Sequence, residues 1–71
     1  MKYAVIIEKG PSSYGAYVPD LPGCVAVGET REEAEELIRE AIDEHLAILR
    51  ASGDHVPQPA SIVTYVDAPA A

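Results

Sequence analysis

A helix-start signal followed by an apolar stripe constrains this chain more than any other feature. Thr30 can accept a hydrogen bond from the amide of Glu33, whose carboxylate can reach back, as in a capping box. Gly53 is a natural C-terminal cap. Between them the apolar positions recur at helical spacing and form one stripe about 100–140° wide. The stripe consists of Ala34, Leu37, Ile38, Ala41, Ile42, His45, Ile48 and Leu49. We expect a helix that covers one face of a sheet.

Short β-rich runs surround this helix. Residues 2–8, 14–18 and 24–29 precede it, and residues 61–66 follow it. Turn-forming residues at 9–13 predict a hairpin between the first two runs. Both faces of the first run are largely apolar, which is typical of a central strand. Gly28, near the end of the third run, indicates a bulge or a close backbone approach.

The order of these elements predicts an α+β fold, βββαβ. Short loops favour antiparallel pairing of the first three strands. A right-handed crossover through the helix brings the last strand into the same sheet, parallel to the first. The one helix covers one face, so the other face stays bare and is expected to bind a partner.

The length of 71 residues predicts one domain, residues 1–71, that is only marginally stable alone. Cys24 has no second cysteine for a disulfide, and one Cys with two His matches no zinc-ligand spacing. We therefore expect no metal or cofactor, and a homodimer or higher homo-oligomer as the source of added stability.

No apolar run spans a bilayer or forms a signal peptide, which favours a cytoplasmic protein without membrane contact.

The net charge is −7, and eight of the twelve acidic residues lie between Glu29 and Glu44. Such a surface repels phosphate, so direct nucleic-acid binding by this chain is disfavoured. It would attract a basic partner and speed encounter with it. A solvated helix face that only maintains solubility is the alternative.

Two surfaces are candidates for partner binding. One is the proline-rich loop, in which Asp20 and Leu21 supply a charge and an apolar anchor and Gly23 supplies a turn; a rigid link between strands is the alternative. The other is the polar side of the helix, with Glu32, Glu36, Glu40 and Asp43.

No catalytic residue is predicted. Glu8 and Asp20 are too few to converge on metal ions for nuclease chemistry. His45 lies within the apolar stripe, where a packed structural histidine is favoured over a functional one. Cys24 has no neighbouring base in sequence and is interpreted as a small buried residue.

The whole pattern resembles the HicB antitoxin family. The resemblance rests on the stretch from Tyr17 to Cys24 (Tyr-Val-Pro-Asp-Leu-Pro-Gly-Cys), Gly28-Glu29-Thr30, and Glu33-Ala34 opening an acidic helix. It covers nearly the whole chain. It implies a partial ribonuclease-H-like fold, in agreement with the element order.

The resemblance also implies a type II toxin–antitoxin role, in which the protein covers HicA, a small basic mRNA-cleaving toxin. Longer members carry a C-terminal DNA-binding domain; this sequence ends after the last predicted strand, so we expect a short form. The alternative from another class is a solitary oligomeric module that binds a small molecule or a different protein.

Overall fold

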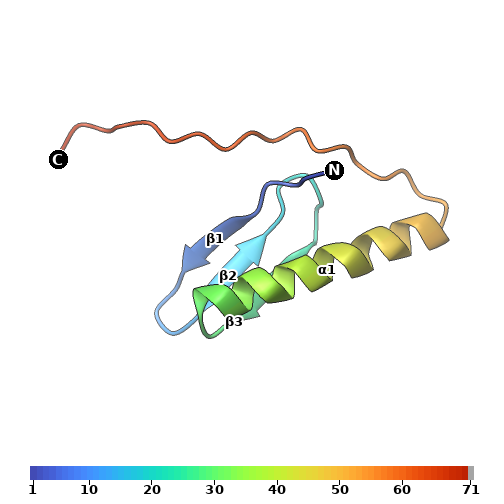
Figure 1. Ribbon diagram of the computed structural model, residues 1–71, viewed down its shortest axis with the longest axis horizontal. Helices are drawn as coiled ribbons and strands as arrows, with labels where there is room; N and C mark the ends of the chain where they lie inside the picture. Colours follow the sequence, from blue (N-terminus) through green and yellow to red (C-terminus); the bar gives the residue numbers. More distant parts are fainter. Residues whose placement is uncertain (71) are drawn as a thin grey trace.

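Three short strands and one long helix form two layers in the computed structural model, which describes residues 1–70 (Figure 1). The elements are β1 (Ile6–Lys9), β2 (Tyr14–Tyr17), β3 (Val25–Gly28) and α1 (Arg31–Ala51). The α+β class and the order of these four elements are confirmed. The strands are shorter than predicted because the ladder is limited by β2: Ile6 pairs with Tyr17, and Val18 already turns away into the following loop.

The sheet has the order β1-β2-β3, and both pairs are antiparallel. The central strand is therefore β2, whereas the sequence predicted that the first strand lies in the middle. That prediction required a fourth strand beside β1. Residues 61–66 are extended but pair with no strand among residues 1–70 (Figure 1). A β-rich sequence favours an extended backbone, but a strand also needs a partner edge, and β1 keeps its outer edge open.

The core lies between the sheet and α1. Alternation places Ile7, Ala16 and Ala26 opposite one another on the inner face. The buried side chains are Ala16, Val18, Leu21, Cys24, Ala34, Ile38 and Leu46. The helix packs mainly over β3 and β2 and least over β1, so the inner face of β1 is only partly covered.

Both predicted helix caps are formed. Thr30 Oγ1 accepts a hydrogen bond from the Glu33 N–H at 3.0 Å. The Glu33 carboxylate reaches one residue further back than a standard capping box, to the Glu29 N–H at 2.8 Å. At the other end Gly53 has φ +72°, and the Asp54 N–H donates to the Leu49 carbonyl at 2.9 Å. This is a Schellman-type end that a glycine adopts at little cost.

Gly28 is a close-approach glycine, the second of the two alternatives that its position indicated. A Cβ built on Gly28 would lie 2.6 Å from the Ala34 backbone nitrogen, at the first turn of α1. Real Cβ contacts are not this short, so only glycine lets β3 approach the helix this closely. The contact fixes where α1 starts above the sheet.

Two members of the predicted apolar stripe lie outside the core. Leu37 is 37 % exposed and Ile48 is 66 % exposed, whereas Leu46, absent from the predicted stripe, is buried. At 3.6 residues per turn, Leu37 and Ile48 lie about 80–100° from Ile38, at the centre of the buried stripe, so both fall on the flank. The predicted stripe therefore has the right width, and the buried stripe is rotated around the helix toward Leu46.

The outer face of the sheet is bare, as expected. Val25 and Val27 are 64 % and 66 % exposed, and Tyr17 is 41 % exposed on the same face. No segment among residues 1–70 covers these side chains. The protein therefore presents an uncovered apolar sheet face opposite its helix.

Candidate partner-binding surface

The predicted helix carboxylates share one exposed surface. We call Glu32, Glu36, Glu40 and Asp43 the acidic face; all four are exposed. Helical geometry places them within an arc of about 80° and over about 16 Å of axis. Because they point away from the core, they form a row of negative charge along the solvent side of α1.

Among residues 1–70, the one ion pair on this row is made by Arg39. Arg39 Nη1 lies 3.2 Å from Glu36 Oε2, and both side chains are about two-thirds exposed (68 % and 64 %). An exposed pair of this kind contributes little to stability, about 0–1 kcal/mol. Because four carboxylates stand against one paired cation, the acidic face keeps a net negative charge.

The predicted loop residues are placed differently. Leu21 is fully buried, with 0 % exposed, and packs in the core. Its N–H donates to the Val18 carbonyl at 3.1 Å, and its own carbonyl accepts from the Cys24 N–H at 3.0 Å. Gly23 has φ +84° and is exposed. Leu21 therefore holds the loop onto the core, and its side chain offers no surface to a partner in this structure.

Asp20 holds the C-terminal part of the chain. Its Oδ2 accepts hydrogen bonds from the backbone N–H groups of Ala60 and Ser61, each at 2.9 Å, and its Oδ1 accepts from the Ser61 hydroxyl at 2.9 Å. The Ser61 and Ala60 N–H groups lower the pKa of Asp20, because they stabilise the ionised carboxylate. A second link nearby joins the Tyr3 hydroxyl to the Pro57 carbonyl.

The two predicted surfaces do not form one continuous site. The Asp20 loop joins the end of β2 to the start of β3, whereas α1 and its acidic face begin just after the other end of β3. The structure brings the helix carboxylates together and assigns Asp20 to a contact within the chain. Sequence patterns could not show that contact, because its partners lie 40 and 41 residues away.

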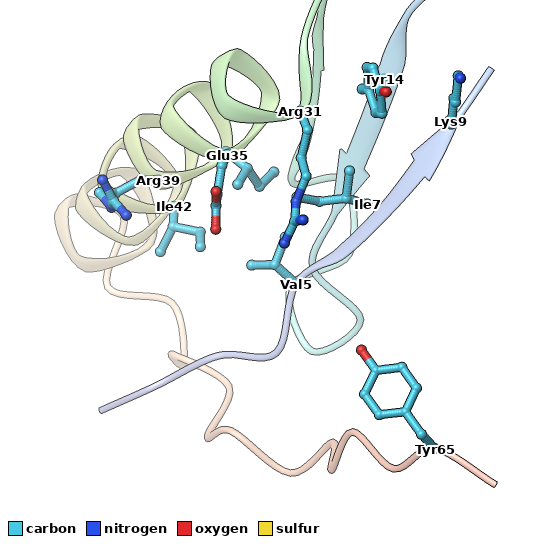
Figure 2. A pocket seen from close by; sticks show the side chains of 10 residues that line it. Val5, Ile7, Lys9, Tyr14, Arg31, Glu35, Arg39, Ile42 and Tyr65 are labelled. Carbon is cyan, nitrogen blue, oxygen red and sulfur yellow. The ribbon is translucent and has the colours of Figure 1, made fainter. Parts of the chain in front are cut away.

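A hollow of about 640 Å³ lies between β1 and α1, and sequence analysis missed it (Figure 2). Its floor is apolar and its rim carries three of the five basic residues of the chain. It is lined by Val5, Ile7, Lys9, Tyr14, Arg31, Glu35, Ile38, Arg39, Ile42 and Tyr65. In Figure 2 the Arg31 side chain extends across the hollow toward Val5, and Tyr65 stands apart on the C-terminal segment. The hollow exists because α1 covers β1 least.

The candidate nucleophile and metal ligands are dispersed. Cys24 is buried, and burial raises the pKa of its thiol, which disfavours the reactive thiolate. His45 is half-buried in the helix stripe and His55 is exposed. Within residues 1–70 no three His, Cys, Asp or Glu side chains gather in a group that could hold a metal ion. Over the same residues, α1 is not apolar enough to cross a bilayer.

Comparison with known proteins decides the family. Residues 3–71 match the family described as the HicB-like antitoxin of bacterial toxin–antitoxin systems. The chain belongs to the HicB-like antitoxin family. The resemblance seen in the loop and helix-start motifs is thereby confirmed over nearly the whole length.

Several relatives are similar along most of the chain. A UPF0150 protein of Thermoplasma acidophilum is 41 % identical over 59 residues, covering 82 % of this chain and 86 % of that protein. A UPF0150 protein of Synechocystis is 40 % identical over 62 residues, covering 86 % of this chain and 78 % of that protein. An uncharacterised 14.9 kDa protein of Haemophilus phage HP1 is 35 % identical over 69 residues. That match covers 97 % of this chain but about half, 52 %, of the phage protein.

Proposed function

We propose that this HicB-like protein is an antitoxin that binds and occludes a small basic mRNA-cleaving toxin of the HicA kind. Family membership supports the antitoxin role. The observation that supports binding to a basic toxin is the acidic face, which consists of four exposed carboxylates in one row on α1. In this proposal the chain has no catalytic role of its own and acts by covering another protein.

In the proposed complex, the carboxylates of the acidic face take the place of the RNA phosphates. A protein that cleaves RNA must hold a phosphate backbone, so its working surface carries positive charge. A row of carboxylates about 16 Å long presents negative charge over the length of a few nucleotides. Binding there would exclude RNA by occupying the same basic surface. The same charges would accelerate encounter between the two proteins.

The proposal also covers nucleic-acid binding, the Asp20 loop, the complete fold and the oligomeric state. The negative charge disfavours operator or RNA binding by residues 1–71 themselves, which we propose act as one domain in the cytoplasm. Gly23 and the backbone around Asp20 would add a secondary contact. We further infer that the complete fold is the partial ribonuclease-H-like βββαβ, with residues 61–66 as the fourth strand parallel to β1, and that the protein is a homodimer or higher homo-oligomer.

A second function is favoured by the hollow between β1 and α1. Its apolar floor and basic rim would suit a small anionic molecule or an acidic peptide. In that case the protein would be a solitary oligomeric regulatory module with no toxin partner. A neighbouring reading frame for a small basic protein favours the antitoxin, and the lack of one favours the solitary module.

Co-expression with a small basic protein encoded next to this one tests the proposal. We expect the two proteins to co-purify and the complex to leave RNA intact, while the basic protein alone cleaves it. Glu36→Lys with Glu40→Lys should abolish protection. Glu8→Lys with Asp54→Lys is the matched control, because it makes the same change in net charge away from the acidic face. Equal protection by both double variants would overturn the assignment of the site.

A further inference from the structure

Residues 61–66 are apolar but uncovered. Ile62 is 89 % exposed, Tyr65 is 94 % exposed and Val66 is 82 % exposed. After the contacts of Ser61 with Asp20, the chain runs past the sheet and leaves the body of the molecule (Figure 1). The radius of gyration is 14.1 Å, against about 11 Å expected for a compact chain of this length. An exposed apolar segment of this kind is stabilised only by a surface that covers it.

The molecule has a surface that lacks a cover. The outer edge of β1 has no hydrogen-bonded neighbour among residues 1–70. Beside this edge, the inner side chains Val5 and Ile7 are only half-buried and form part of the floor of the hollow. An open edge next to an apolar hollow is a template for one more strand.

The segment matches this edge in length and in pattern. Six residues of strand span about 20 Å, enough to run from Val5, just before β1, to the end of β1 at Lys9. Alternation places Val63 and Tyr65 on one face of such a strand, and Tyr65 already lines the hollow. Val63 and Tyr65 can thus cover Val5 and Ile7, while Ile62 and Val66 extend the bare outer face.

Charge fixes the direction. Asp67 directly follows the segment, and Lys9 stands at the far end of β1 on the rim of the hollow. A strand parallel to β1 brings Asp67 to the Lys9 end, whereas an antiparallel strand brings it to the Val5 end. Within residues 1–70, no ion pair engages Lys9 or Arg31. The rim therefore offers free positive charge to an incoming Asp67.

We propose that residues 61–66 of a second copy of this chain bind parallel to β1 and fill the hollow, and that the exchange is reciprocal. The segment runs past its own β1 without pairing with it (Figure 1), while a second copy can supply an identical strand to the open edge. Reciprocal exchange closes a two-fold dimer and covers the outer edge of β1 in both copies. The proposal deepens the self-association proposed above, because the fourth strand of the βββαβ fold then comes from the second copy, and it does not depend on toxin binding.

Mixed disulfide cross-linking tests the exchange in the isolated protein. Two differently tagged chains are used, both with Cys24→Ala, one with Val5→Cys and the other with Val63→Cys, because a parallel strand that brings Asp67 to Lys9 places Val63 beside Val5. They are unfolded together, refolded and oxidised. We expect a covalent heterodimer of one chain of each kind. A single chain carrying both cysteines should give covalent dimers as well. Monomers with an internal disulfide, and no mixed dimer, would overturn the exchange.

Charge reversal gives an independent readout that leaves the apolar contacts in place. Lys9→Glu and Asp67→Lys should each weaken the dimer about five-fold, the size expected for exposed ion pairs present twice in a two-fold dimer. The Lys9→Glu and Asp67→Lys combination should restore it, and Asp54→Lys should leave it unchanged, as measured by sedimentation equilibrium. Weakening without restoration would overturn the parallel direction. Toxin protection measured on the same variants separates failure of the exchange from failure of the antitoxin assignment.

Discussion

The body of the molecule and its C-terminal segment contain similar side chains in opposite environments. In the body, Leu21 and Ile38 are 0 % and 2 % exposed. In the segment, Ile62 and Val66 are 89 % and 82 % exposed. The body covers the apolar groups on the inner face of its sheet with its own helix, whereas nothing among residues 1–70 covers the segment. The comparison shows that apolar character alone does not place a residue in a core, since a packing partner is also required.

The largest expected effect separates the two regions directly. Leu21→Ala should lower the free energy of unfolding by about 2–5 kcal/mol, because it empties a fully enclosed site. Ile62→Ala should change it by less than about 0.5 kcal/mol in dilute, monomeric protein, because Ile62 has few contacts to lose. Urea unfolding followed by circular dichroism measures both. A similar loss for the two variants would mean that the segment packs onto its own body.

A second pair of substitutions tests the contact that positions the helix. Gly28→Ala should destabilise the body by about 1–3 kcal/mol, because the added Cβ meets the Ala34 backbone and the helix start must shift. Gly15→Ala in the neighbouring strand is the control, since a Cβ there meets nothing within 4 Å. Thermal unfolding of both variants is the measurement. Equal stability of the two would contradict the close packing of β3 against α1.

The smallest effect concerns the junction between body and segment. The folded pKa of Asp20 lies below its ordinary value of 3.8, so the bonds to Ala60 and Ser61 should be at full strength above that pH. They should weaken as pH falls through the lower folded pKa, when the carboxylate takes up a proton. Hydrogen exchange of the Ala60 and Ser61 amides should therefore show protection near pH 5 that is lost in acid.

Asp20→Ala should remove this protection at every pH, and Asp54→Ala, which changes an exposed aspartate after the helix, should preserve it. Protection that survives Asp20→Ala would show that another group holds the segment.

Local signals predicted the parts of the fold that depend on local chemistry. The Thr30 and Glu33 cap and the Gly53 end each require particular residue types at fixed spacing, so the sequence revealed them. Gly28 indicated either a bulge or the close approach that the structure shows. The burial of Leu21 and the contacts of Asp20 depend on segments distant in sequence. Their only local hint is that Leu21 is the one large apolar residue in a loop of prolines and glycine.

Local sequence pattern could not predict which strand residues 61–66 pair with, because pairing also depends on segments distant in sequence. β-propensity predicts an extended backbone, which the structure has, but it does not say which edge the backbone joins. The same limit applies to the candidate site. Helical spacing correctly placed Glu32, Glu36 and Glu40 on one exposed side. The hollow with Lys9 and Arg31 on its rim arises only when β1 and α1 come together.

The central claim is that the acidic face receives a basic toxin, and the association rate tests it most directly. Stopped-flow mixing would measure this rate from about 0.01 M to about 0.15 M salt, over which the Debye length falls from about 30 Å to about 8 Å. For the unaltered protein we predict a rate that falls steeply with salt. Glu36→Lys with Glu40→Lys should lower the rate about ten-fold or more at low salt and remove most of the salt dependence. The same rate and salt dependence in this variant as in Glu8→Lys with Asp54→Lys would contradict the account.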